Sequence, residues 1–234
     1  MQKMLSYVRR AVDQYHMIEE GDVIAVGVSG GKDSLALLSA LAGLRRFYPK
    51  KFEVKAITLE MGYDEMDFTP VAALCQKLGV EFITEQTDIK TVVFDIRKEE
   101  NPCSLCANMR RGALNDVLLS LGCNKIALGH HFDDVVETVL MSLLYEGRFS
   151  CFLPVTYLDR AGVTVIRPMI YMPEKDIRYL AKKAELPVVE STCPADKHTE
   201  REEMKQFLAR LDHENRGLKY RIYGAIQRGE VDGF

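Results

Sequence analysis

The fold is decided by the stretch Val23-Ile24-Ala25-Val26-Gly27-Val28-Ser29-Gly30-Gly31-Lys32-Asp33-Ser34-Leu35-Ala36-Leu37-Leu38. An apolar run, then small residues, then apolar residues at helical spacing predict a buried strand, a tight turn and a helix beginning near Asp33. Glycines let the backbone approach a phosphate, the N–H groups of the turn point at it, and the positive end of the helix dipole favours its charge. The stretch therefore predicts an anion-binding turn, to which Lys32 and the hydroxyls of Ser29 and Ser34 add donors.

Two better-known phosphate-binding loops do not match this turn. Walker A requires Gly-x-x-x-x-Gly-Lys-Ser/Thr, but Val26 stands at its first glycine and Asp33 at its Mg²⁺-binding hydroxyl. The dinucleotide fingerprint Gly-x-Gly-x-x-Gly fails because Ser29 occupies its second glycine position. The hexapeptide of residues 29–34 instead resembles the PP-loop of the ATP pyrophosphatases, which cut ATP between its α- and β-phosphates. An ordinary glycine-rich turn between a strand and a helix is the alternative.

The composition limits the class of protein. With 47% hydrophobic and 28% charged residues among 234, the chain is typical of a globular protein of one domain or about one and a half. The N-terminus has no apolar core or cleavage site and no apolar run approaches spanning length, so we expect a cytoplasmic protein without a membrane partner. Six cysteines then indicate metal or sulfur chemistry rather than disulfides. The net charge of −3 disfavours a generally basic nucleic-acid binder, so any RNA contact must use local patches.

Alternating strand and helix patterns predict an α/β fold with a doubly wound parallel sheet, right-handed crossovers and a small C-terminal helical extension. We expect an N-terminal helix in 1–20, an ATPase domain with an inserted cysteine-bearing helix in 21–190, and a tail in 191–234. Because ligands collect outside the carboxyl ends of parallel strands, the loop 60–67 after Leu59 is expected to border the adenine. Besides the first strand, strands are expected at 52–59, 80–85 and 125–128, with a hairpin within 152–168. Helices are expected at 3–19, 35–47, 71–78, 89–98, from the cysteine pair to 121, 135–145, 173–184 and 200–227, the last broken at Gly217.

Three cysteines lie outside the elements that are expected to be buried. Cys103 and Cys106 are separated by two residues, so their thiolates can converge on one metal centre. This pair alone fits a zinc, redox or iron–sulfur role. With Cys193, three thiolates fit a [4Fe–4S] cluster that leaves one iron open to an external ligand. A purely structural or redox-active pair is the alternative, and the remaining cysteines are expected to be small buried hydrophobes: Cys75, Cys123 and Cys151.

A second polar motif follows a predicted strand at the start of a helix, Gly129-His130-His131-Phe132-Asp133-Asp134. Carboxylates in such a place either cap the helix or hold Mg²⁺ and the attacking group near the phosphates. We expect Asp133 to cap the helix and Asp134 to be functional, since it shares a sheet edge with the phosphate loop. Arg110 lies one helical turn after Cys106 and is expected to reach both the cysteines and the phosphates. Arg111 is equally a candidate solvated charge.

Taken together, these motifs, with Ile166-Arg167-Pro168, closely resemble the tRNA 2-thiocytidine synthetase group of the tRNA thiolation enzymes. The resemblance covers roughly residues 20–195 in order, and the combination is more specific than any one motif. It implies a PP-loop ATPase of the adenine nucleotide α-hydrolase (HUP) class that carries an iron–sulfur cluster, usually as a homodimer. Such an enzyme adenylates the C2 oxygen of a tRNA pyrimidine, here cytidine by preference, and replaces it with sulfur from sulfide or a desulfurase persulfide. AMP and pyrophosphate are the other products.

The resemblance also implies roles for individual positions of this sequence. Asp134, with Asp33 and Lys32, would be catalytic. The cluster ligands would be Cys103, Cys106 and Cys193. The residues that would bind ATP and Mg²⁺ are Ser29, Gly30, Gly31, Lys32, Asp33, Ser34, Leu59, Arg110 and Gly129.

Two departures from the family bear on the substrate. The chain lacks the terminal zinc-binding cysteine pairs of the thiouridine synthetases, which favours the thiocytidine branch, but it has Cys193 alone where longer thiocytidine enzymes show a second pair. A persulfide relay acting on another tRNA position, such as in 2-thiouridine synthesis, or on a small molecule or carrier is the second hypothesis, and a non-catalytic RNA- or nucleotide-binding module is the third. A basic, stacking-capable tail is expected from Arg210, Arg216, Lys219, Tyr220, Arg221, Tyr223 and Arg228.

Overall fold

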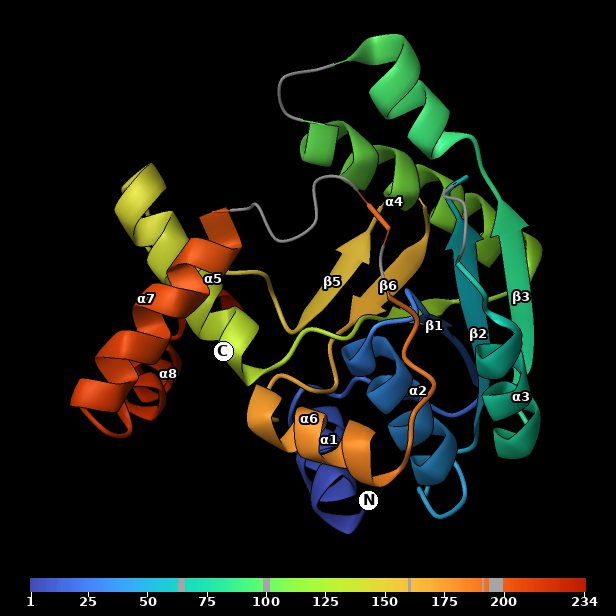
Figure 1. Cartoon of the computed structure of the whole chain (residues 1–234). Coiled ribbons are helices and arrows are strands. Elements are labelled where there is room, and N and C mark those ends of the chain that lie inside the picture. The colour runs from blue at the N-terminus through green and yellow to red at the C-terminus, as the bar shows by residue number, and fades with distance from the viewer. Residues whose placement is uncertain (63–65, 99–101, 160, 191, 194–199) are drawn as a thin grey trace.

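The computed structural model of the chain describes residues 1–62, 66–98, 102–159, 161–190, 192–193 and 200–234. At its centre is a six-stranded sheet with the strand order β3-β2-β1-β4-β6-β5 (Figure 1). Among the strands of the described residues, the edge strand β5 is the antiparallel one, so the expected α/β parallel sheet is confirmed with one antiparallel edge. The strands are β1 (Asp22–Gly27), β2 (Phe52–Glu60), β3 (Glu81–Gln86), β4 (Lys125–Ala127), β5 (Val155–Leu158) and β6 (Val163–Ile166).

The order of the strands creates a switch point at the centre of the sheet. The chain runs outward from β1 through β2 to β3 and then returns to place β4 on the other side of β1. The connections that leave β1 and β4 therefore diverge to opposite sides, and ligands bind in the crevice that such a divergence opens. The segment 128–131 meets the loop that follows β1 at this point, since Gly129 lies against the backbone of Asp33 and Ser34.

The two faces of the sheet are covered very differently. One face carries the larger apolar core, which helices from both halves of the chain complete. In the described part of the chain, the second face is covered mainly by α4 (Pro102–Ser120), whose Val117 and Leu118 pack on Ala25 and Ile126. The larger core includes side chains from α1 (Gln2–Gln14), α2 (Lys32–Leu44), α3 (Thr69–Leu78), α5 (Phe132–Glu146), α6 (Glu174–Lys183), α7 (Glu200–Glu214) and α8 (Leu218–Arg228).

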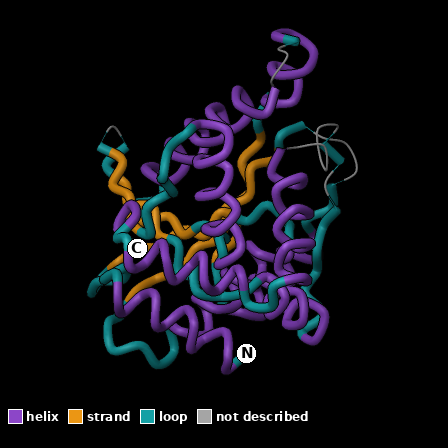
Figure 2. Tube along the Cα trace, turned by 90° about the vertical axis from the view of Figure 1, so that its left-hand side faces the viewer, coloured by secondary structure: helices purple, strands orange, loops and turns teal. Residues whose placement is uncertain are grey.

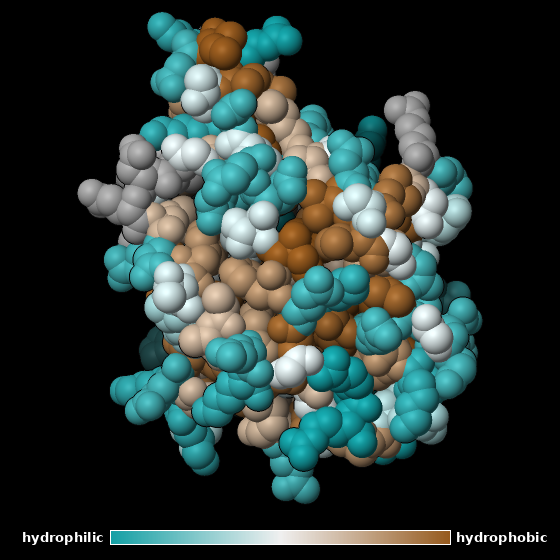
Figure 3. Space-filling view, turned by 90° about the vertical axis from the view of Figure 1, so that its right-hand side faces the viewer, coloured by the Kyte–Doolittle hydropathy of each residue, from teal (hydrophilic) through white to brown (hydrophobic). Residues whose placement is uncertain are grey.

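The last two helices lie against α5 rather than on the sheet itself (Figure 1). Seen from that side, helices stand in front of the strands (Figure 2). On the opposite side of the molecule, where β3 forms the sheet edge, apolar surface is exposed between polar side chains (Figure 3). Within the described residues, no helix is long and apolar enough to cross a membrane.

Several predicted elements end at other residues in the structure. The N-terminal helix stops at Gln14 rather than at 19, because the backbone of His16 turns to a φ of +48° that a helix cannot continue. Residues 91–97 form a π-helix, η1 (Thr91–Arg97), instead of an α-helix, and a short 3₁₀ helix, η2 (Val231–Gly233), follows α8. Pro173 is the N-cap of α6 rather than its first helical residue. The predicted hairpin and the break at Gly217, which has a φ of +81°, are confirmed.

Candidate active site

The PP-loop lies between the end of β1 at Gly27 and the start of α2 at Lys32. The buried Ser34 hydroxyl holds the loop together, since it lies 3.2 Å from the Ser29 N–H and donates to the Gly31 carbonyl at 3.0 Å. This hydroxyl is thus used within the turn. The backbone N–H groups at the start of α2 remain the donors that the helix presents to an anion.

Two glycines allow other segments to approach the loop. Gly30 has a φ of +82°, and a Cβ on it would lie 2.9 Å from the Cβ of Val189. Gly129, which follows β4, approaches so closely that its Cβ would lie 3.2 Å from backbone atoms of Asp33 and Ser34. The Val189 N–H also donates to the Gly30 carbonyl at 3.0 Å, which fixes the C-terminal segment against the loop.

Lys32 is held by two carboxylates. Its Nζ lies 2.9 Å from Asp33 and 3.0 Å from Glu174, the first residue of α6. Glu174 also accepts from Lys205 at 2.8 Å and from Arg178 at 2.7 Å. Burial alone would raise the pKa of Glu174, but the hydrogen bonds from these three cations lower it well below its usual range. Sequence reasoning missed Glu174, because its only signal was an acidic residue in the first turn of a predicted helix.

His131 joins the PP-loop to the start of α5. Its Nδ1 accepts from the Asp134 N–H at 3.4 Å, while its Nε2 lies 3.9 Å from Asp33 Oδ1. Asp134 in turn accepts from the His131 N–H at 2.8 Å, so these two residues form the capping box of α5. The prediction that Asp133 caps this helix is wrong. Asp133 instead accepts from the Glu174 N–H at 2.7 Å, at the start of α6, and from Lys219 at 2.8 Å.

The cysteine pair lies in the first two turns of α4. Cys103 is exposed, and Cys106 and Cys193 are half-buried. Burial raises the pKa of the Cys106 thiol, the Arg110 guanidinium opposes this rise, and the Cys193 and Cys103 thiols add to it, so all three groups act electrostatically on Cys106. Within the described ranges, no three His, Cys, Asp or Glu side chains are arranged as a formed metal site.

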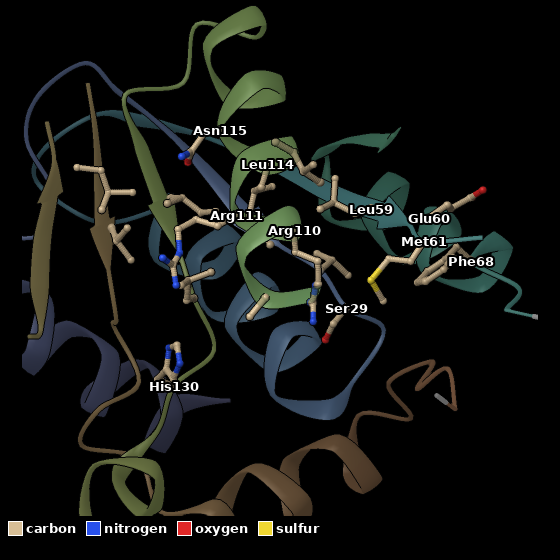
Figure 4. A pocket seen from close by; sticks show the side chains of 18 of the residues that line it. Ser29, Leu59, Glu60, Met61, Phe68, Arg110, Arg111, Leu114, Asn115 and His130 are labelled. Carbon is tan, nitrogen blue, oxygen red and sulfur yellow. The ribbon is translucent and has the colours of Figure 1, made fainter. Parts of the chain in front are cut away.

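A pocket of about 820 Å³ opens between α4 and the strands. One part, the PP-loop half, is lined by Ser29, Leu59, Met61, Phe68 and Arg110. The other, the strand half, lies over β4, β6 and β5 and includes Arg111, Asn115, His130, Thr156 and Arg167. In Figure 4 the side chain of Arg110 extends toward Ser29, and that of Arg111 extends toward His130. Part of the loop expected to border the adenine, residues 63–65, lies outside the described residues.

The expected basic and aromatic tail is largely committed to packing and internal contacts. Tyr223 is buried and stacks on Phe132 with ring centroids 4.7 Å apart. Lys219 is bound to Asp133, and Arg221 donates to the backbone carbonyls of residues 215 and 216. Tyr220 is the exposed aromatic residue of the expected set.

Comparisons with known proteins agree with this geometry. The model of a family described as a PP-loop domain matches residues 4–211. The tRNA-cytidine(32) 2-sulfurtransferase of Geobacter sulfurreducens is 38% identical over 96% of this chain and 88% of its own length. That of Pelobacter propionicus is 40% identical over 88% of this chain and 78% of its own length. Among solved structures, the U34-tRNA thiolase NcsA from Methanococcus maripaludis with its [4Fe–4S] cluster superposes with a TM-score of 0.79 at 27% identity, covering 97% of this chain and 77% of NcsA.

The PP-loop at the switch point, the cysteine pair on α4 and the extent of these similarities lead to one assignment. This chain belongs to the tRNA-cytidine(32) 2-sulfurtransferase family of PP-loop proteins.

Proposed function

We propose that this protein catalyses the ATP-dependent replacement of the 2-oxygen of cytidine 32 in tRNA by sulfur. The observation that carries the proposal is the single pocket that joins the PP-loop to the helix bearing Cys103 and Cys106. A protein that only binds a nucleotide would need the PP-loop but not the cysteine-bearing helix. A pocket that serves both would allow activation of a carbonyl oxygen and its replacement by sulfur at one place.

The chemistry takes two steps. The cytosine O2 attacks the α-phosphate of ATP, the bond between the α- and β-phosphates breaks, and pyrophosphate leaves. A sulfide nucleophile then attacks C2, and the adenylated oxygen departs with AMP. Adenylation is required because it converts a poor oxygen leaving group into a good one.

The PP-loop half of the pocket is proposed to bind ATP. Leu59 and Phe68 would border the base, while Ser29, Gly30, Gly31 and the first turn of α2 would face the phosphates. Lys32 would exchange part of its contact with Glu174 for phosphate oxygens, and Arg110 would add a second positive charge.

A carboxylate at this site supports Mg²⁺ binding. Asp33 Oδ1 is buried and has no hydrogen-bond partner among the described residues, as expected of an oxygen reserved for a hard cation. Asp134 is proposed to be the catalytic carboxylate, in addition to its cap on α5. The Oδ1 atom of Asp134 is not part of the capping box. It forms a long ion pair with Arg201, whose Nη1 lies 3.7 Å away.

The three cysteines are proposed to hold a [4Fe–4S] cluster. The chemistry of the donor set supports this proposal, because three thiols suit such a cluster and the charges of Cys103, Cys193 and Arg110 all act on Cys106. When bound, such a cluster supplies an iron site that holds the sulfur to be transferred. Arg110, one turn after Cys106, would stabilise the negative charge of the thiolates and of the phosphates.

The partners follow from the same proposal. The substrate is tRNA, the sulfur comes from sulfide or a cysteine desulfurase persulfide, the enzyme acts in the cytoplasm, and a homodimer is expected from the family. Several residues of the C-terminal tail are used in internal contacts. Contact of the tail with RNA would therefore use exposed positions such as Arg210, Tyr220 and Arg228.

The test uses anaerobically reconstituted protein with ATP, Mg²⁺, sulfide and unmodified tRNA. We expect AMP and 2-thiocytidine to form together, measured by chromatography and by mass spectrometry of nucleosides. A tRNA with uridine at the target position is the matched control and should give neither product. An absence of AMP with unmodified tRNA would contradict the proposal.

A further inference from the structure

The strand half of the pocket is not needed for ATP on the PP-loop. It exists because α4 is the main cover of this face, so the outer strands β6 and β5 stay uncovered beside it. Its walls are apolar and come from Leu114, Leu128, Leu158 and Val165. These side chains form surfaces against which a flat ring can pack.

Hydrogen-bond donors without counter-charges face this half of the pocket. Arg111 is exposed and Arg167 is half-buried. Neither forms an ion pair with any described residue, although a half-buried guanidinium such as that of Arg167 usually has one. Burial lowers the pKa of Arg167 to about 10, and its Nε is buried without a hydrogen-bond partner in the described chain. Such a set is typical of a site for a ligand rich in acceptors.

Arg167 is held in a fixed position. Its Nη1 donates to the Leu153 carbonyl at 2.6 Å and lies 3.2 Å from the Thr156 hydroxyl, and its guanidinium lies over the Phe152 ring at 5.0 Å. His130 also packs on Phe152, with ring centroids 4.8 Å apart. Burial and the charge of Arg167 lower the pKa of His130 to about 4, so its ring stays neutral at physiological pH. The strand half is therefore preformed.

Resting on the proposed function, we propose that the strand half is the binding site for the extruded target cytosine, with Arg111 and Arg167 donating to its O2 and N3 edge. Cytosine presents two adjacent acceptors there, which match donors that form no ion pair with a carboxylate in the described part of the chain. An enzyme acting on a base must take it out of the stack and hold it in such a pocket. Asn115 supplies a side-chain oxygen that can accept from the exocyclic amine.

The position of this half also suits both reaction steps. It is continuous with the PP-loop half, so a base held there would lie beside ATP bound on the PP-loop. Cys103, Ala107 and Arg111 are spaced four residues apart along α4 and so share one face of the helix. Cys103 would therefore lie on the same face of α4 as Arg111, toward the N-terminal end of the helix.

The test is a double-mutant cycle between Arg111 and the base. The wild-type protein and the Arg111→Met variant are titrated at one salt concentration with an anticodon stem-loop RNA that carries either cytidine or an abasic site at the target position. Salt is fixed because phosphate contacts dominate the total affinity. Arg46→Met is the matched control, since Arg46 is also exposed and lies beyond the end of α2, outside the pocket.

We expect Arg111→Met to change the ratio of the two dissociation constants by about tenfold or more, as for a hydrogen bond from a charged donor. Arg167→Lys, which keeps the charge and loses the planar fork, should change the same ratio in the same direction. Arg46→Met should leave the ratio unchanged. The affinity for ATP should stay unchanged in all variants.

Two results would overturn the inference. The first is that Arg111→Met weakens binding by the same factor for the cytidine RNA and the abasic RNA. This result would mean that Arg111 does not contact the base. A tenfold loss of ATP affinity in the same variant would mean that the strand half holds part of the ATP. If the wild-type protein thiolates tRNA and the cycle shows no coupling, this inference alone fails, whereas wild-type protein that forms no 2-thiocytidine contradicts the proposed function.

Discussion

Gly129→Ala tests how closely the end of β4 must approach the PP-loop. The added Cβ would lie 3.2 Å from the carbonyl carbon of Asp33 and 3.2 Å from the amide nitrogen of Ser34. Favourable contacts between carbon atoms are about 3.5–4.0 Å. Both atoms belong to the backbone of the first turn of α2, so no side-chain rotation can relieve the contact, and the helix start must move by a few tenths of an ångström.

Overpacking of this size costs about 1–3 kcal/mol. Because the strain falls on the turn that is proposed to bind the phosphates, we expect it to weaken ATP binding rather than only the fold. If all of it appears in binding, the dissociation constant for ATP rises about 5- to 150-fold. Isothermal titration calorimetry with ATP and Mg²⁺ measures this change, and thermal unfolding measures the part that appears as lost stability.

Gly112→Ala is the matched control. A Cβ on Gly112 meets nothing within 4 Å, and the residue lies within the exposed part of α4. This substitution should leave ATP binding unchanged and stabilise the helix by up to about 1 kcal/mol. If Gly129→Ala binds ATP like the wild type and also unfolds at the same temperature, the close approach at Gly129 does not matter to the site and the reasoning is refuted.

Three further predictions concern charged and thiol groups. Cys193→Ser should lose the brown cluster absorbance after anaerobic reconstitution, as Cys106→Ser should, while keeping its ATP affinity; a full cluster in this variant would contradict the three-thiolate proposal. Lys32→Met should weaken ATP binding about 10- to 150-fold. Its melting temperature should stay nearly unchanged, because Glu174 keeps Arg178 and Lys205 as cationic partners. Unchanged ATP binding by calorimetry would exclude Lys32 from the phosphate site. Burial and the carboxylate of Asp134 raise the pKa of Glu137 from 4.5 to about 7, so the folded chain holds a proton that the unfolded chain releases, and the free energy of unfolding should fall as pH rises through this window. Glu137→Gln should remove that slope and raise the free energy of unfolding at pH 8 by about 1–3 kcal/mol in urea titrations, and an unchanged slope would show that another group causes it.

Features that depend only on neighbouring residues could be predicted from the amino-acid sequence. The apolar run from Val23 and the small residues after Gly27 specify a strand and a turn wherever they occur, because burial, positive φ and helix initiation act over a few residues. The spacing of Cys103 and Cys106, and of Arg110 one turn later, likewise follows from helix geometry alone. Alternation of strands and helices was enough to predict a parallel sheet.

Contacts between groups that are distant in the sequence became visible only in the folded chain. Lys32 and Glu174 are separated by most of the chain, and nothing near either residue signals the other. Asp133 and Asp134 are adjacent in the sequence but have different partners. Asp134 accepts from the His131 N–H at the start of α5, whereas Asp133 accepts from the Glu174 N–H at the start of α6. The packing of the helices fixes which carboxylate oxygen meets which N–H group. Tyr223, expected at the surface, is buried because α8 packs on α5.

The two halves of the pocket differ in how far the sequence predicts them. The PP-loop half could be located from the sequence, because a parallel sheet gathers its ligands at the carboxyl ends of its strands. The strand half could not, since it depends on β6 and β5 lying beyond β4 and on α4 being the main described cover of that face. Strand order and helix cover are set by the balance of packing over the whole chain, so the surroundings of Arg111 and Arg167 exist only in the folded protein.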